Sequence, residues 1–164
     1  MANWCSNSVV FAGNDDDLYT VFKFFEALRN RKMEEAKAIA PGLAEKSFMT
    51  FCGIEMNGNV IEFETQYQPN IALLVDLSNF FDVSFLLQYD ECVEQFYGQA
   101  VYSYHILTIC EIPFNSIYEY ETGKEQFNYN GMHFDFAYDL LDVLVDEKIN
   151  ESISPSSWNP IHFS

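Results

Sequence analysis

The stretch MNGNVIEFETQY, residues 56–67, decides the fold. Asn57-Gly58 between two extended runs is the strongest short-range signal for a β-hairpin, because these residues adopt the positive φ angles that a tight turn requires. After the turn, apolar or hydroxyl side chains alternate with acidic or amide ones: Ile61, Phe63, Thr65 and Tyr67 share one face, and Glu62, Glu64 and Gln66 share the other. We therefore predict two paired strands, over residues 48–55 and 59–67.

The segments on either side of this hairpin alternate between strand and helix. Residues 7–11 read as a strand, and Gly13-Asn14 followed by three aspartates reads as the start of a helix. That helical region ends at Pro41-Gly42 and holds one or two helices. Pro69 suits the first turn of a second helix that runs to Asp82, and residues 83–90 return to the period of a strand.

The resulting order is strand, helix, strand, strand, helix, strand. It predicts an α+β fold with a ferredoxin-like βαββαβ core, in which both helices pack on one face of an antiparallel sheet. Residues 95–110 read as a long strand or a bent pair, 118–121 and 126–129 as short strands, and about 134–149 as a helix. We predict one domain over 1–151, with a core over 1–98 and an extension over 99–151, followed by an extended Ser- and Pro-rich tail over 152–164.

Composition argues for a folded protein. Of the 164 residues, 49% are hydrophobic, and 16 Phe and 10 Tyr are far more aromatic residues than a disordered acidic chain carries. The four cysteines are scattered and form no CxxC pair, and the start of the chain has no basic, apolar leader pattern. We therefore expect a cytoplasmic protein with reduced cysteines.

Charge is distributed unevenly along the chain. Residues 1–46 hold six basic and seven acidic residues, whereas residues 47–164 hold two basic residues, Lys124 and Lys148, and eighteen acidic ones. A surface of that sign repels nucleic acid and anionic membranes. We expect no direct binding to either, and a basic protein is the partner that the charge favours.

Three motifs resemble a known family. They are Trp4-Cys5-Ser6-Asn7, then FETQYQP over residues 63–69, and Tyr89-Asp90-Glu91 together with Phe96-Tyr97-Gly98. This combination resembles a bacterial family carried on plasmids, phages and conjugative elements and described as an Api-like protein with a ferredoxin-like domain. The resemblance covers about residues 1–98 and implies the fold and a mobile-element context, but no activity.

The sharpest local feature is a run of carboxylates near the C-terminus. Asp135, Asp139, Asp142 and Asp146 are spaced four, three and four residues apart, so on one helix they form a single stripe that Glu147 extends. The stripe is either a surface that receives a basic partner or a solvated face opposite the apolar side of the helix.

A pocket is a second candidate site. Trp4, Asn7, Tyr67 and Glu91 are polar and aromatic members of the three motifs, and a pocket built from them at one end of the sheet would bind a ligand rather than react with it. The alternative is that these side chains form the edge of the core. No catalytic residue and no metal-ligand set is assigned, and the isolated glycines form no phosphate-binding pattern, so we expect no cofactor.

These observations lead to three hypotheses of function. The first is a non-enzymatic accessory protein of a mobile genetic element that binds a basic protein, with a DNA mimic as its narrower form. The second is a divalent-metal-dependent hydrolase that uses Asp90, Glu91, Glu94 and one of the three histidines. The third is a homo-oligomeric structural module that pairs through a sheet edge.

Overall fold

The structure is a computed structural model that describes residues 3–91, 95–113 and 127–153. The first six elements in chain order are β1 (Trp4–Ala12), α1 (Asp15–Arg29), α2 (Met33–Ile39), α3 (Ala44–Thr50), β2 (Cys52–Asn57) and β3 (Val60–Gln66). The remaining elements are α4 (Ile71–Phe81), β4 (Ser84–Glu91), β5 (Phe96–Ser103), β6 (Ile106–Pro113), β7 (Phe127–Tyr129), β8 (Met132–Phe134) and α5 (Ala137–Ile153).

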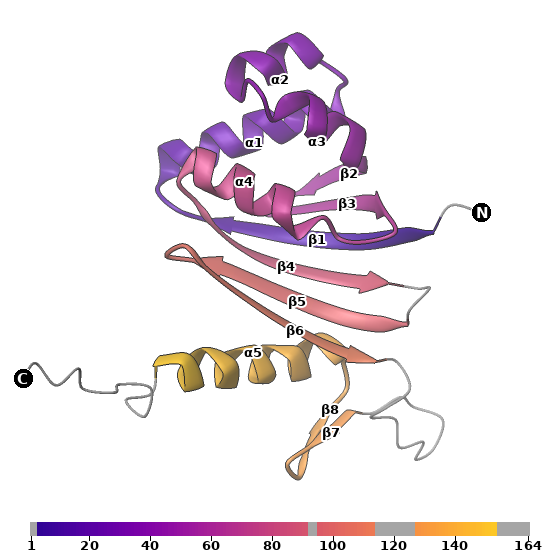
Figure 1. The fold of residues 1–164 in the computed structure, drawn as a ribbon. Coiled ribbons are helices and arrows are strands. Elements are labelled where there is room, and N and C mark those ends of the chain that lie inside the picture. The colour runs from indigo at the N-terminus through magenta and orange to yellow at the C-terminus, as the bar shows by residue number, and fades with distance from the viewer. Residues whose placement is uncertain (1–2, 92–94, 114–126, 154–164) are drawn as a thin grey trace, which may run out of the picture.

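Six strands form one antiparallel sheet in the order β2-β3-β1-β4-β5-β6, and β7 and β8 form a separate hairpin. The first four positions, β2-β3-β1-β4, are the arrangement of the ferredoxin-like unit. The β5–β6 hairpin extends the sheet beyond β4 (Figure 1). The predicted α+β, ferredoxin-like fold with additional C-terminal strands and a helix is confirmed.

The main core lies between this sheet and the layer formed by α1 to α4. The helix α1 begins at Asn14, whose Oδ1 accepts the Asp17 backbone N–H at 2.9 Å, and three aspartates occupy its first turn, as its sequence predicts. Phe24 and Phe25 of this helix are completely buried. They pack above Val9 and Leu87, which point from β1 and β4 toward the same layer.

A second core lies on the opposite face of the sheet, under α5. Tyr97 and Gln99 of β5 contact this helix, whereas Ala100 and Tyr102 of the same strand belong to the main core. Because alternate side chains of a strand point to opposite faces, α5 and the layer of α1 to α4 lie on opposite sides of the sheet. The helix α5 packs mainly against β5 and β6.

Three local predictions are wrong. Residues 48–50 belong to α3 rather than to a strand, because Ala44 and Ser47, one helical turn apart, are buried under the helical layer. The last helix begins at Ala137 rather than at Phe134, since Phe134 pairs with Phe127 in the β7–β8 hairpin. That helix also continues to Ile153, past the predicted start of the tail at residue 152.

The other elements agree with the predicted order. The predicted strand over 7–11 is the centre of the longer β1, and residues 95–110 fall in the β5–β6 hairpin, the bent pair of the two alternatives. The strand predicted over 118–121 and the tail after residue 153 lie outside the described residues.

Candidate functional site

The face of β1, β3 and β4 that points away from α1 to α4 carries rows of polar side chains. Ser6 lies between Glu64 on β3 and Asp90 on β4, and Ser8 lies between Glu62 and Gln88 on the same two strands. Ser6, Glu62 and Glu64 are exposed, and Ser8, Gln88 and Asp90 are half-buried. We call this surface the open face.

A groove of about 540 Å³ runs across the open face. The strand β2 contributes Glu55, which lies directly opposite Glu62, and α5 contributes Tyr138 at the other side of the groove. The register of β2 against β3 shifts between Cys52 and Glu55, where Gly53 adopts a φ of 58°. Bulges of this kind re-aim side chains and are common next to functional sites.

The groove is acidic, and its lining residues in the described part of the chain include no cation. Glu55, Glu62, Glu64 and Asp90 supply four carboxyl groups, and Ser6, Ser8 and Gln88 supply neutral polar groups. Like charges directly opposite each other on neighbouring strands destabilise a sheet, so the Glu55–Glu62 pair works against the stability of the fold. This group of residues is called the acidic groove below.

Asp90 is half-buried, whereas the three glutamates of the acidic groove are exposed. Burial raises its pKa above the ordinary value of 3.8, although a backbone hydrogen bond opposes that shift. Burial, and after it the charge of nearby Asp90, also raises the pKa of the Tyr138 hydroxyl. Tyr138 therefore remains a neutral hydrogen-bonding group at the wall of the groove.

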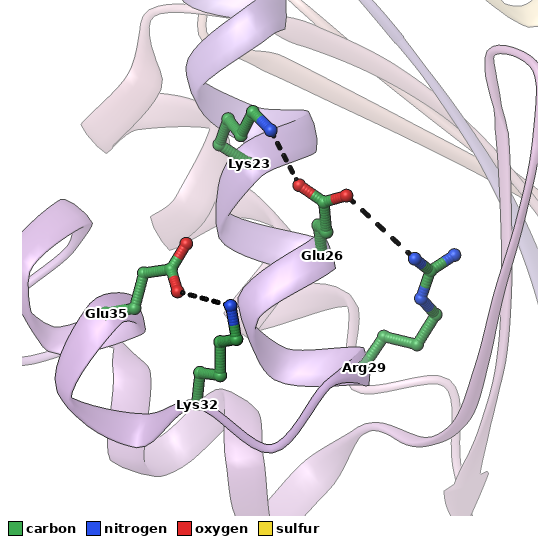
Figure 2. Close-up of polar contacts among 5 residues, drawn as sticks. All are labelled: Lys23, Glu26, Arg29, Lys32 and Glu35. Atoms are coloured by element: carbon green, nitrogen blue, oxygen red, sulfur yellow. Dashed lines mark hydrogen bonds and ion pairs between the residues drawn. The ribbon is translucent and has the colours of Figure 1, made fainter.

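The basic residues of the N-terminal part lie in the helical layer, and four of the six form ion pairs there with acidic residues: Lys23, Arg29, Lys32 and Lys37. Figure 2 shows Glu26 between Lys23, at 2.8 Å, and Arg29, at 4.0 Å, and Lys32 beside Glu35 at 3.3 Å. Such exposed pairs add little stability, but they neutralise charge locally. The ion pairs therefore neutralise part of the charge of the helical layer, whereas the described lining of the acidic groove, on the other side of the sheet, includes no cation.

The acidic residues predicted to form a single stripe have different environments. Asp135 precedes α5, so it does not share a helical face with the others, and this part of the prediction is wrong. Asp142 accepts a hydrogen bond from Nε2 of Gln99 at 2.7 Å, and Glu147 accepts one from the hydroxyl of Tyr129 at 2.9 Å. Asp139 and Asp146 are exposed.

The four residues of the predicted pocket are divided between the two sides of the sheet. Tyr67 and Glu91 line one hollow at the end of the sheet. Asn7 is 4% exposed and donates hydrogen bonds to the Cys5 carbonyl oxygen at 2.8 Å and to Thr65 Oγ1 at 2.9 Å. Trp4 points to the other face of β1, and the odd spacing between positions 4 and 7 could have shown that from the sequence.

Residues named in the metal-hydrolase hypothesis do not converge within the described part of the chain. Residues 3–91, 95–113 and 127–153 contain no group of three or more His, Cys, Asp or Glu side chains arranged to hold a metal ion. His105 contacts Asn79 and Tyr102, and His133 contacts Asn128. Glu94 and His162 lie outside the described residues.

Comparison with known families gives a match that includes β3 and β4 of the open face. A family model described as "Ferredoxin-like domain in Api92-like protein" matches residues 48–130, which is half of the chain. The chain belongs to this family. The matched range begins within α3 and reaches past β7, so it includes the β5–β6 hairpin but not β1 or α1, and it differs from the range over 1–98 suggested by the sequence motifs.

Comparisons with curated proteins and with solved structures gave no match. Among the helices that the structure describes, none has the length and apolarity needed to span a membrane.

Proposed function

We propose that this protein is a non-enzymatic interaction module that binds a basic partner protein through the acidic groove. The observation that carries the proposal is that Glu55, Glu62, Glu64 and Asp90, from three strands, line one groove whose described residues include no cation. A pair of carboxylates directly opposite each other costs stability, and a basic side chain placed between them would remove that cost. The resemblance to a mobile-element family supports a role as an accessory protein of such an element.

The segregation of charge supports the same proposal. Lysine and arginine residues of the helical layer are engaged with Glu26, Glu35 and Glu45, so they do not screen the acidic groove from the other side of the sheet. A surface of one sign accelerates encounter with a partner of opposite sign and disfavours partners of the same sign. The open face would therefore select basic proteins over nucleic acids.

A narrower form of the proposal is a DNA mimic. Glu62 and Glu64 are two residues apart on one strand, which places their Cα atoms about 6.5 to 7 Å apart along the strand. This row of carboxylates lies on the sheet, and the acidic residues of α5 form no continuous row of their own. A mimic would compete with DNA for its partner, whereas a general acidic module would bind without displacing DNA.

The proposal can be tested with a fluorescently labelled lysine-rich peptide and two double variants that remove the same number of charges. Glu62→Gln/Glu64→Gln neutralises the acidic groove, and Asp139→Asn/Asp146→Asn neutralises exposed positions of α5. Two exposed ion pairs contribute up to about 1 kcal/mol each, so the groove variant should bind the peptide about tenfold more weakly by fluorescence anisotropy. The α5 variant should bind nearly as well as the wild type.

An equal loss of affinity in both double variants would show that only the total charge of the protein matters, and the proposal would then be wrong. The groove variant is expected to fold, because replacing Glu62 with Gln relieves the repulsion from Glu55 and keeps an amide that can still bond to Asn57.

A further inference from the structure

A second hollow, of about 610 Å³, lies at the end of the sheet on the side of α4. The connection between β3 and α4 supplies Tyr67 and Gln68, the end of β4 supplies Glu91, the start of β5 supplies Phe96, and β6 supplies Glu111. Two of the sequence motifs, around residues 63–69 and 89–98, therefore meet here. We call this site the end hollow.

Buried hydrogen bonds hold the wall of the end hollow in place. Asn7 donates to Thr65 Oγ1 at 2.9 Å, and the Thr65 hydroxyl donates to the carbonyl oxygen of Gln68 at 2.7 Å. The backbone N–H of Tyr67 donates to the carbonyl oxygen of Asn3 at 2.8 Å. These hydrogen bonds hold the backbone at and beside Tyr67. Tyr67 itself is 64% exposed, so its side chain faces solvent rather than the core.

Glu111 is held at the end hollow by a residue of the core. The hydroxyl of Tyr89, a residue that is 0% exposed, donates to Glu111 Oε1 at 2.7 Å. Tyr89 lies on β4 and Glu111 on β6, so the tyrosine ring crosses the intervening strand β5 directly over Gly98. Burial, and after it the hydrogen bond to Glu111, raises the pKa of Tyr89, so the hydroxyl remains a donor and orients this carboxylate.

The residues that line the end hollow combine two carboxyl groups with aromatic rings. Glu91 is 3% exposed and Glu111 is exposed, and the described residues of the lining include no Lys, Arg or His. The N-terminus of α4 also borders the hollow and carries about half a positive charge, which is smaller than the full charge of the exposed Glu111 carboxylate. The net local charge therefore favours a cation, and Tyr67 and Phe96 offer ring faces to its alkyl portion or its charge.

We propose that the end hollow binds a primary alkylammonium group. The ammonium N–H groups would donate to the exposed carboxylate of Glu111, and the methylene chain would lie against the rings of Tyr67 and Phe96. The ligand is either a free polyamine or the side chain of a lysine on another protein. The proposal does not depend on the acidic groove, because Asp90 and Glu91 are neighbours on β4 and point to opposite faces of the sheet.

Isothermal titration calorimetry at about 150 mM NaCl, where charges beyond about 8 Å are screened, tests the proposal with two probes. Spermidine represents the free amine, and Nα-acetyl-lysine methylamide represents the lysine side chain. The Glu111→Gln variant keeps an acceptor for Tyr89 but lacks the charge, and Glu34→Gln is the matched control on the exposed surface of α2. A second variant, Tyr67→Leu, removes an exposed ring from the hollow without changing charge.

We expect saturable binding of at least one probe, weakened about tenfold in Glu111→Gln, weakened in Tyr67→Leu and unchanged in Glu34→Gln. The probe with the higher affinity identifies the source of the ammonium group. Equal binding by wild type and Glu111→Gln, or no binding of either probe at millimolar concentration, would overturn the proposal. Binding should persist in Glu62→Gln/Glu64→Gln, so the end hollow and the acidic groove can fail independently.

Discussion

Gly98 lies directly under the ring of Tyr89. A Cβ atom at this position would stand 2.1 Å from Cζ of the tyrosine, a distance that real Cβ atoms do not adopt. The absence of a side chain is therefore what lets Tyr89 cross β5 and reach Glu111. At this site a single glycine links the packing of the core to the geometry of the end hollow.

We predict that Gly98→Ala destabilises the protein by about 1–3 kcal/mol or more, because the added methyl group must displace a fully buried ring. Urea unfolding followed by circular dichroism measures the change. In a double-mutant cycle with Tyr89→Leu, the cost of the pair should be smaller than the sum of the single costs, since the shorter side chain relieves the overlap. Additive costs would contradict the explanation.

Asp90 makes stability depend on pH. Its pKa is raised in the folded state, chiefly by burial, so the folded protein binds this proton more tightly than the unfolded chain does. The stabilisation from the proton is complete below the unfolded pKa, near 3.8, and is lost as pH rises through the raised folded value. The charged carboxylate of Asp90 therefore lowers the stability of the folded protein at neutral pH.

We expect Asp90→Asn to raise the melting temperature by a few degrees at most at pH 7, and this gain should shrink toward zero as the pH approaches 3. Calorimetric scans of both proteins across that range provide the measurement. A gain that stays constant over the whole range would show that the effect comes from the amide itself rather than from removal of a desolvated charge.

At the scale of elements, α5 packs against the sheet, and its aspartates differ in their contacts. The side chain of Asp142 is bonded to Gln99, which is 1% exposed and also accepts a hydrogen bond from Gln88 at 3.2 Å. Asp146 is one helical turn further on and is exposed. The two positions have the same residue type and charge, but only the first satisfies a buried amide.

We predict that Asp142→Ala costs about 1–3 kcal/mol, because it leaves Nε2 of Gln99 without this acceptor in a buried position. Asp146→Ala removes the same charge and should change stability little. The free energy of unfolding in urea compares them directly. Equal values for the two variants would mean that α5 is held by its apolar side alone.

At the scale of the whole molecule, charge is segregated between two layers. The net charge is -17, the helical layer pairs four basic residues with acidic ones, and the described lining of the acidic groove holds four carboxyl groups and no cation. Self-repulsion of this size destabilises a compact state. Salt should therefore act on folding and on partner binding in opposite directions.

We expect the melting temperature to rise by several degrees when NaCl increases from about 10 mM to about 150 mM, because the screening length falls from about 30 Å to about 8 Å. Binding of the lysine-rich peptide should weaken over the same range. Replacement of NaCl by KCl should give the same rise in melting temperature, and dependence on the identity of the cation would indicate specific ion binding instead.

Much of the fold could be predicted from local patterns. The Asn57-Gly58 turn, the alternation over residues 59–67 and the three aspartates after Asn14 each act through neighbouring residues, and the structure contains the hairpin and the helix that they predict. The start of the last helix was predicted wrongly although its cause is also local, because Asn130-Gly131 forms the turn of a short hairpin just before that helix. Phe134 pairs with Phe127, which delays the last helix by a turn and places Asp135 outside it.

The sequence by itself determined the order of the core elements, the alternation within each strand and the separation of charge along the chain, because these follow from the backbone and from adjacent side chains. The tertiary structure alone decided which face of the sheet the helices cover and which carboxylates become neighbours. Glu55 and Glu62 are close in sequence, but Asp90 and Glu111 join their sites only through strand order and register. The periodicity of the sequence indicates which residues share a face of an element, whereas only the packed structure shows which other elements that face contacts.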